Sequence, residues 1–199
     1  MKHFIFRILS FLYPYKILQR LSIYKDSIYS LWICNFIGKI GKNSRICYPC
    51  SLQGGGENNI SIGDYSTIYG FSTLGCRTKY GKQSFPNASI KIGNHCHIGE
   101  YNHITSCNSI TIGDGLLTGR YVLISDNSHG SLSKEESLVE PIKRNLKSKG
   151  GVVIGNNVWL VDKVAVLAGV HIGNNVIVAA NAVVTKDLPD NCMAAGVPR

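Results

Sequence analysis

Aliphatic residues recur at every sixth position along most of this chain. The run from residue 154 to residue 189 is uninterrupted, and the same spacing can be followed backwards to residue 40. This period matches neither the α-helical repeat of about 3.6 residues nor the simple alternation of a single strand, so it predicts short strands joined by similar tight turns. All ladder positions except Thr118 are Ile, Leu or Val: Ile40, Ile46, Leu52, Ile62, Ile68, Leu74, Ile92, Ile98, Ile104, Ile112, Thr118, Ile124, Ile154, Leu160, Val166, Ile172, Val178 and Val184.

Insertions divide this ladder into runs whose length is always a multiple of three rungs. Four extra residues precede Ile62, twelve precede Ile92, two precede Ile112 and twenty-four precede Ile154. Three rungs must therefore close one triangular coil, and every insertion must leave the prism at the same corner. We expect an all-β fold, a parallel β-helix of about six triangular coils, whose handedness does not follow from the spacing.

The chain outside this repeat is short. At 199 residues it is long enough for one well-buried domain and too short for two ordinary domains with linkers. We expect a helical N-terminal segment over residues 1–39 and a β-helix over residues 40–189 that carries a loop at 130–153. Residues 190–199 are expected to form a C-terminal tail.

Positive charge is concentrated at the N-terminus. Residues 1–45 contain eight Lys and Arg but only one acidic residue, Asp26, so this segment accounts for +7 of the formal charge of +9. Apolar residues are interleaved with these charges, and such a basic amphipathic segment can rest on an anionic membrane surface. The alternative is a helical cap whose apolar side packs on the open end of the β-helix.

The uncharged run 27–38 is too short to span a bilayer. We expect no nucleic-acid partner, because the positive charge is not accompanied by any recognisable nucleic-acid-binding motif.

The seven cysteines are irregularly spaced, and no cleavable signal peptide precedes them. This pattern indicates reduced thiols and a cytoplasmic protein. Cys47 and Cys50 form a CxxC pair of the kind found in redox and metal sites, but the pair lies within the repeat and no helix is predicted after it. We therefore favour a structural role for both cysteines, and we expect no bound metal.

Four motifs in the C-terminal half resemble those of one enzyme family. They are Ile-Gly-Asn-Asn-Val-Trp-Leu from Ile154, Ala-Gly-Val-His-Ile-Gly ending at Gly173, Val-Val-Thr-Lys-Asp-Leu-Pro ending at Pro189, and Ala-Gly-Val-Pro ending at Pro198. The chain resembles the left-handed β-helix acyltransferases, in particular the branch of maltose and galactoside O-acetyltransferases, xenobiotic acetyltransferases and polysaccharide O-acetyltransferases. The resemblance is densest over residues 92–198. It implies a left-handed coil, acetyl-CoA as the acyl donor, and a homotrimer whose active sites lie between subunits.

The resemblance also implies a general base. In that family a histidine at the base of a protruding loop takes the proton of the acceptor hydroxyl, and His129 stands at this point, directly before the longest insertion. Imidazole suits this role because its neutral form accepts a proton near neutral pH. The other ring nitrogen needs a partner that fixes the tautomer, and Asp126 or a backbone carbonyl could supply it.

Further positions are implied to border acetyl-CoA. Trp159 would line the pantetheine channel or, alternatively, pack on a neighbouring subunit, and the backbone N–H of Asp162 would stabilise charge on the thioester oxygen. The remaining positions matched to the coenzyme A site are Ala180, Thr185, Lys186 and Arg199, of which the last two would face its phosphates.

This sequence departs from the family pattern near the coenzyme A site. Many relatives have glycine where this chain has Val161, Ala179 and Asn181, so its main chain would lie slightly farther from the cofactor. The sequence also stops at Arg199, where relatives usually continue through a short tail. Coenzyme A affinity is therefore less firmly implied than the identity of the base.

Sugar hydroxyls are usually held by amides and carboxylates at the lip of a cleft. We expect Asn102, Asn108 and Asp126 to bind the acceptor, with ordinary corner packing as the alternative for the two asparagines. Together with the resemblance, these observations predict an acetyl-CoA-dependent O-acetyltransferase that acts on a carbohydrate in surface polysaccharide biosynthesis. Two alternatives stay open at this point, a xenobiotic acetyltransferase and a non-catalytic β-helix scaffold.

Overall fold

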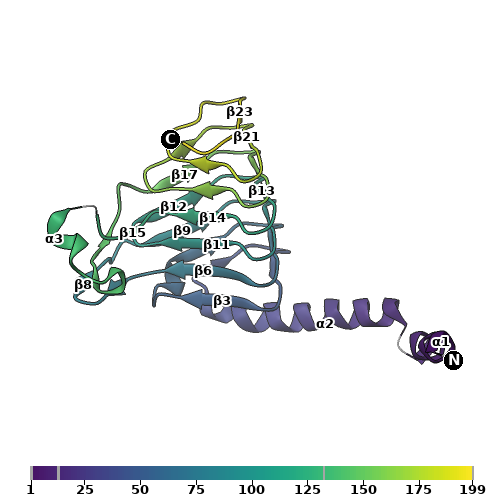
Figure 1. Ribbon diagram of the computed structural model, residues 1–199. Coiled ribbons are helices and arrows are strands. Elements are labelled where there is room, and N and C mark those ends of the chain that lie inside the picture. Colours follow the sequence, from purple (N-terminus) through teal and green to yellow (C-terminus); the bar gives the residue numbers. More distant parts are fainter. Residues whose placement is uncertain (1, 13, 132, 199) are drawn as a thin grey trace.

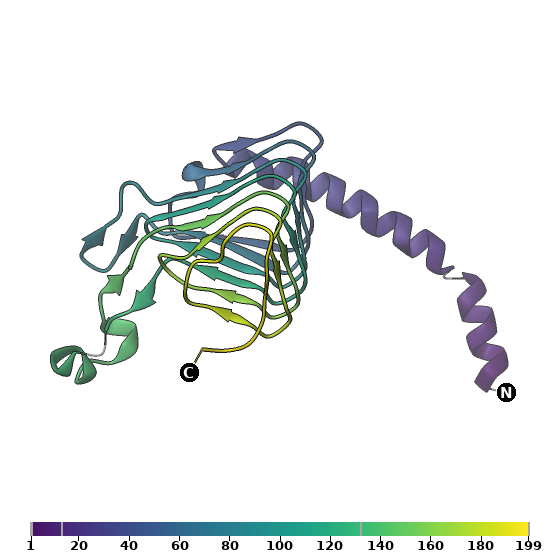
Figure 2. The same cartoon turned by 90° about the horizontal axis from the view of Figure 1, so that it is seen from above.

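Three parallel sheets form the sides of a triangular prism, and each coil of the chain adds one short strand to each sheet (Figure 1 and Figure 2). The computed structural model describes residues 2–12, 14–131 and 133–198. The predicted fold class is confirmed, because the chain forms a left-handed parallel β-helix that is preceded by helices. The expected phosphate contact Arg199 lies outside the described residues.

From β1 to β22, the strands outside the insertions lie on sides A, B and C in regular rotation. Side A contains β1 (Lys39–Ile40), β4 (Ile60–Ile62), β9 (Ser89–Ile92), β12 (Ser109–Ile112), β17 (Val152–Ile154) and β20 (His171–Ile172). Side B contains β2 (Arg45–Ile46), β5 (Thr67–Ile68), β10 (His97–Ile98), β13 (Leu117–Thr118), β18 (Trp159–Leu160), β21 (Ile177–Val178) and β23 (Met193–Ala194). Side C contains β3 (Cys50–Gln53), β6 (Ser72–Cys76), β11 (His103–Ser106), β14 (Leu123–Ser125), β19 (Ala165–Val166) and β22 (Val183–Val184).

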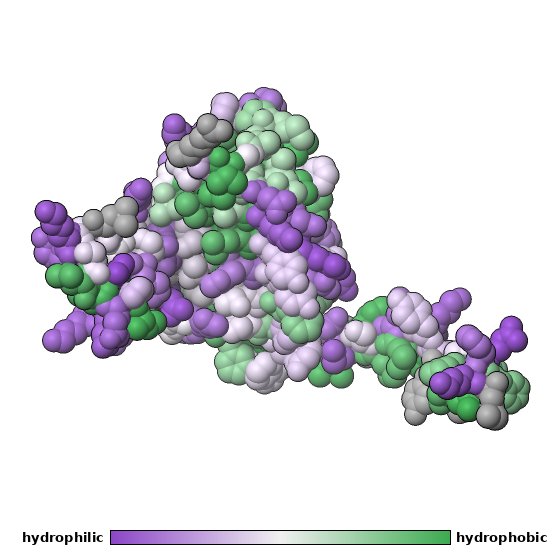
Figure 3. Space-filling view, in the orientation of Figure 1, coloured by the Kyte–Doolittle hydropathy of each residue, from purple (hydrophilic) through white to green (hydrophobic). Residues whose placement is uncertain are grey.

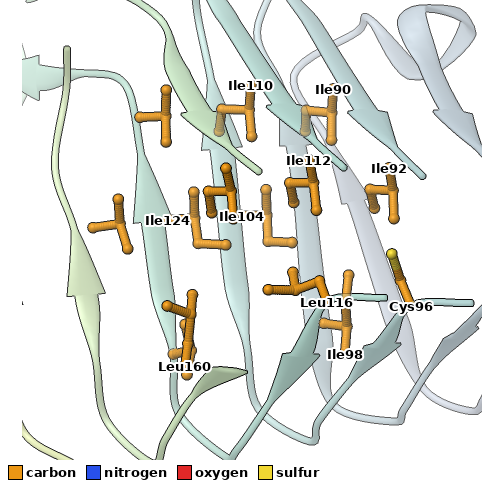
Figure 4. Packing of buried hydrophobic residues seen from close by; sticks show 14 of the residues in the cluster. Ile90, Ile92, Cys96, Ile98, Ile104, Ile110, Ile112, Leu116, Ile124 and Leu160 are labelled. Carbon is orange, nitrogen blue, oxygen red and sulfur yellow. The ribbon is translucent and has the colours of Figure 1, made fainter. Parts of the chain in front are cut away.

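The predicted ladder is the register of the sheets. Ile62 pairs with Ile92 on side A, Leu160 with Val178 on side B, and Ile104 with Ile124 on side C. Because coils stack in register, the same side of each rung faces inward and its aliphatic side chains form a dry column (Figure 4). Burial of this apolar surface is the main favourable contribution to the stability of such a fold.

Close stacking of the coils explains the glycines that follow the ladder residues. At the corner between sides A and B, a Cβ on Gly93 would lie 2.5 Å from the carbonyl oxygen of Gly113. The neighbouring turn positions Asn157 and Asn175 have φ angles of 54° and 56°, a left-handed conformation that Asn tolerates better than most residues. The short distance between stacked coils therefore explains why small residues and asparagine recur at the turns of the six-residue repeat.

Every insertion lies at the corner between sides C and A, as the gaps in the ladder predicted. The first insertion contains η2 (Glu57–Asn59), and the second contains the hairpin β7 (Lys79–Tyr80) and β8 (Gln83–Ser84). The longest contains β15 (Ser128–His129), α3 (Lys134–Ser137), η3 (Pro141–Lys143) and β16 (Leu146–Lys147). We call this the loop corner.

The N-terminal segment is helical, with α1 (Lys2–Leu12), α2 (Tyr15–Ile33) and η1 (Cys34–Phe36). Only the end of α2 contacts the first coil, and the rest of both helices projects from the prism (Figure 1 and Figure 2). Neither α1 nor α2, the long helices among the described residues, has the length and apolarity needed to cross a bilayer.

The face of α2 that contacts the β-helix carries polar side chains beside the buried Ile33. Asp26 Oδ1 accepts the N–H of Tyr48 at 3.0 Å, and Ser30 Oγ accepts the N–H of Ile46 at 3.0 Å. No coil precedes the first one to pair these N–H groups, so they need acceptors, and the helix supplies them from side chains.

The end of α2 caps the first coil, as one of the two interpretations of this segment expected, whereas most of the apolar side chains of α2 do not pack on the β-helix. Near its end Ile33 is buried, but most of the large apolar side chains of α2 are exposed. Ile17, Leu21, Ile28 and Trp32 have exposed fractions of 53, 58, 69 and 55%. Leu21, Ile28 and Trp32 line an open groove together with residues of the first coil, so they border the prism without being buried by it. The projecting part of the helices shows both hydrophobic and hydrophilic residues at its surface (Figure 3).

Candidate functional site

His129 lies at the base of the longest insertion. Strand β15 pairs with β16 in antiparallel fashion, with Ser128 opposite Lys147 and His129 opposite Leu146. This short hairpin holds the main chain at His129, while its side chain is exposed at the loop corner. The sequence-predicted base is therefore anchored by its backbone and open to a substrate.

Two insertions meet at His129. The Nδ1 atom lies 3.2 Å from the hydroxyl of Tyr80, and the two rings pack edge to face with centroids 5.3 Å apart. The Tyr80 hydroxyl also donates a hydrogen bond to the carbonyl of Ile142. Gln83 joins the same two segments, because its Nε2 donates to Leu146 O at 3.1 Å and its Oε1 accepts the Leu146 N–H at 2.7 Å. Sequence reasoning missed Tyr80 and Gln83, since the six-residue pattern is absent inside the insertion.

Asp126 does not hold His129 in this structure. It is fully buried, and its carboxylate accepts the Ser106 hydroxyl at 2.6 Å and the N–H groups of Cys107 and Asn108 at 2.8 and 2.9 Å. Among the described residues, none of its hydrogen bonds joins it to His129. The expectation that Asp126 orients the base or binds the acceptor is corrected, because its charge is used to fix the turn between β11 and β12.

The two asparagines expected at the acceptor site have different environments. Asn102 is buried, donates to the Thr118 hydroxyl through Nδ2, and accepts the Val122 N–H at 2.6 Å through Oδ1. Its side chain therefore belongs to the packing of the corner between sides B and C, which was the alternative interpretation. Asn108 is exposed at the loop corner and stays a prediction for the acceptor.

The positions matched to coenzyme A fall into two groups. Trp159 on β18 is 43% exposed on side B, and Asp162 and Ala180 occupy equivalent positions in successive turns of the B–C corner. Thr185 and Lys186 lie at the loop corner and line a pocket with residues 194–198. Within one chain, His129 and the group around Trp159 therefore lie at different corners.

The backbone N–H of Asp162 lacks an acceptor among the described residues. At the preceding coil the Arg120 N–H is bound by Asp162 Oδ1 at 2.7 Å, and at the A–B corner the Asn156 N–H is bound by Asn174 Oδ1 at 2.8 Å. The next coil places Ala180 over Asp162, and alanine has no side-chain oxygen. This N–H is therefore available to an external acceptor.

The long loop is held by Glu136. Its carboxylate accepts the Ser131 hydroxyl at 2.5 Å and pairs with Lys147 Nζ at 2.7 Å, and its side chain is 20% exposed. The hydrogen bond from Lys147, together with those from Ser131, lowers the pKa of this carboxyl to about 2. These contacts connect the loop to β16, the strand that pairs with His129.

The buried thiols are unsuited to act as nucleophiles. Burial raises the pKa of Cys50 to about 12, and burial together with the charge of Asp126 raises the pKa of Cys107 to about 11. Burial also raises the pKa of Cys47, so the CxxC pair remains protonated at neutral pH, as its structural interpretation requires. Over the described residues, no group of three or more His, Cys, Asp and Glu is arranged to hold a metal ion.

Comparisons with known proteins match the repeat and extend beyond it. Residues 151–186 match the family model "Bacterial transferase hexapeptide (six repeats)". The "Putative lipopolysaccharide biosynthesis O-acetyl transferase WbbJ" of Escherichia coli strain K12 is 36% identical over 162 residues, 79% of this chain and 77% of that protein. The galactoside O-acetyltransferase of the same strain is 34% identical over 125 residues, 57% of this chain and 56% of that protein.

Two solved structures share the fold at low sequence identity. AntD, an N-acyltransferase from Bacillus cereus in complex with dTDP and 3-hydroxybutyryl-CoA, has a TM-score of 0.63 at 20% identity, over 83% of this chain and 81% of that chain. The hexapeptide-repeat containing acetyltransferase VCA0836 from Vibrio cholerae, complexed with acetyl coenzyme A, has a TM-score of 0.53 at 22% identity, over 82% and 68%. At these identities the likeness shows the fold alone.

Replacement of Glu136 by Gln should loosen the long loop. Hydrogen exchange of residues 128–147 should become faster, because the neutral amide no longer pairs with Lys147. The matched control is Glu140→Gln, which removes an exposed pair with Lys143 and should leave exchange unchanged.

The same contact has a defined pH dependence. Because the folded pKa of Glu136 is depressed, its contribution is complete above the unfolded value of about 4.3 and is lost as pH falls toward about 2. Loop protection in the unmodified protein should thus be constant from neutral pH down to about 5 and decline below about 4. Equal rates of hydrogen exchange in Glu136→Gln and Glu140→Gln would contradict the assignment of loop stability to Glu136.

Proposed function

This chain belongs to the bacterial hexapeptide-repeat transferases and is an acyltransferase, and we propose that it transfers the acetyl group of acetyl-CoA to a hydroxyl of a carbohydrate. The observation that carries the proposal is His129, an exposed imidazole on an anchored strand at the corner where all insertions emerge. The names of the relatives favour a carbohydrate over the xenobiotic acceptor, and a role in surface polysaccharide biosynthesis over other carbohydrate pathways.

The reaction needs one base and no covalent intermediate on the protein. As the acceptor oxygen attacks the thioester carbonyl carbon, His129 takes the hydroxyl proton. The tetrahedral intermediate then collapses, the carbon–sulfur bond breaks, and the imidazolium returns the proton to the departing thiolate. The products are the acetyl ester and coenzyme A, and the protonated state of the buried cysteines is in keeping with this direct transfer.

We assign oxyanion stabilisation to the N–H of Asp162. Charge that develops on the thioester oxygen needs a donor that is already in place and not engaged elsewhere. The lack of an acceptor for this N–H, over which Ala180 is stacked, supports the assignment. Exposed Trp159, one strand before it, is proposed to line the pantetheine channel, and Thr185 and Lys186 to border the nucleotide end.

We propose a homotrimer in which one subunit supplies the base and its neighbour supplies the coenzyme A wall. His129 and the group around Trp159 and Asp162 lie at different corners of one prism. A triangular prism that packs by its sides about a threefold axis brings a corner of one copy next to a side of another. The corner placement therefore supports a site shared between copies.

We also propose that the N-terminal helices rest on the inner face of an anionic membrane, where a lipid-linked sugar acceptor would be met. The cations Lys2, Arg7, Lys16, Arg20 and Lys25 lie along α1 and α2. The lone acidic residue of these helices already accepts a hydrogen bond from the first coil. Exposed apolar residues with flanking cations are the composition of helices that lie in a bilayer interface. The free cysteines are in keeping with the cytoplasmic side.

Replacement of His129 by Ala should lower the turnover of acetyl transfer by about a hundredfold to ten-thousandfold, because the acceptor hydroxyl loses its base. Release of coenzyme A, followed with a thiol reagent and a galactoside acceptor, measures the rate. His95→Ala is the control, since His95 lies at the A–B corner and stacks on Tyr65. Transfer that persists in His129→Ala would overturn the assignment of the base.

The shared site can be tested with two inactive chains. His129→Ala lacks the base, and Ala180→Trp should block the space above the Asp162 N–H. When the two are co-expressed with different tags and isolated by both tags, each mixed trimer should hold about one intact site in three. About one third of normal activity should return, whereas a site built within one chain would give none.

Membrane contact should depend on the cations of the projecting helices. The protein should float with vesicles of phosphatidylcholine and phosphatidylglycerol and less with phosphatidylcholine alone. Arg20→Glu should weaken flotation at least about tenfold, and Lys91→Glu, the same charge change on side A, should not. If neither vesicle binds and Arg20→Glu instead changes the oligomeric state, the helices pair with other copies of the chain.

A further inference from the structure

We propose that Tyr80 is a positioning residue that fixes the tautomer of His129. The inference rests on the proposed role of His129 as the general base, and it concerns which ring nitrogen is free to take the proton. Tyr80 belongs to the β7–β8 hairpin, 49 residues from His129 in sequence, and the two side chains meet only because both insertions leave at the loop corner.

The direction of one hydrogen bond determines the direction of the other. A tyrosine hydroxyl has one hydrogen to donate, and the Tyr80 hydroxyl gives it to the carbonyl of Ile142, which can only accept. Toward His129 the hydroxyl must therefore act as the acceptor. Nδ1, at 3.2 Å, must carry the hydrogen, and in the neutral ring Nε2 then keeps its lone pair.

This arrangement suits a base that acts through Nε2. Among the described residues Nε2 has no hydrogen-bond partner, and the ring is exposed. With the hydrogen on Nε2 instead, the lone pair would be on Nδ1. It would then point at the Tyr80 hydroxyl and could not take a proton from the acceptor substrate. Because Nδ1 stays a donor when the ring becomes an imidazolium, the contact with Tyr80 persists while Nε2 takes and returns the proton.

The hydroxyl of Tyr80 is itself held from both sides. The carbonyl of Ile142, in η3 of the long loop, fixes its hydrogen, and the paired bonds between Gln83 and Leu146 fix the hairpin that carries it. The edge-to-face contact of the two rings adds a preferred orientation of the imidazole. Tyr80 thus takes the role that sequence reasoning gave to Asp126 or to a backbone carbonyl.

The test is Tyr80→Phe, which keeps the ring and removes only the hydroxyl. Nitrogen NMR of protein labelled at histidine distinguishes the two ring nitrogens, and His129→Gln identifies the signal of His129. In the unmodified protein Nδ1 should be the protonated nitrogen, and in Tyr80→Phe both tautomers should be populated. The kcat of acetyl transfer should fall at least about tenfold with KM changed by less than about twofold. Tyr65→Phe, a tyrosine at the A–B corner, should match the unmodified protein in both measurements.

Three outcomes would overturn the inference. They are protonation on Nε2 in the unmodified protein, an unchanged tautomer in Tyr80→Phe, and a fall in kcat that is matched by faster hydrogen exchange of residues 128–147. The last would mean that Tyr80 only anchors the loop, which Gln83 should still hold in this variant. The tautomer measurement needs no substrate, so it reports on Tyr80 even if His129→Ala shows the proposed reaction to be wrong.

Discussion

The in-register stacking of coils is the constraint on which the rest of this molecule depends. Each rung pairs with the same rung of the next coil, as Ile62 does with Ile92 and Ile104 with Ile124. An extra residue within a side would shift every later side chain from the interior to the surface. Insertions are thus tolerated only at a corner, and in this chain they share one corner. An exposed imidazole beside two loops is a consequence of that restriction.

The same stacking leaves an edge at the first coil, and the N-terminal helix is shaped by it. Unpaired N–H groups such as that of Ile46 need acceptors, and Ser30 and Asp26 supply them from one face of α2. Ile33 is buried on the same side of the helix, whereas most of the large apolar side chains of α2 are exposed. Leu21 and Ile28 therefore border the capped end of the β-helix without being buried by it.

The repeat could be predicted from the sequence because an aliphatic residue marks the inward-facing position of nearly every rung. The strand register, the shared corner and the place of His129 followed from that periodicity and from motif resemblance. The environments of Asp126 and Tyr80 did not follow. Asp126 is buried by a turn one coil earlier in the chain, and Tyr80 reaches His129 from an insertion that has no period. For the N-terminal segment the sequence left two alternatives, a cap on the β-helix and a membrane contact, and it did not predict the hydrogen bonds that Asp26 and Ser30 accept from the first coil.

The chemistry of a β-helix depends on where its regular hydrogen bonding is interrupted. Along the A–B corner, a side-chain oxygen of each coil binds an N–H of the preceding coil, as Asn174 does for Asn156 and Asp190 does for Asn174. At Asp162 the next coil supplies Ala180, which has no side-chain oxygen, and among the described residues the Asp162 N–H has no acceptor. The exposed imidazole of His129 lies at another corner, on an insertion. The homotrimer proposed above would bring the Asp162 N–H of one copy next to the His129 imidazole of its neighbour, so in that proposal assembly completes the site.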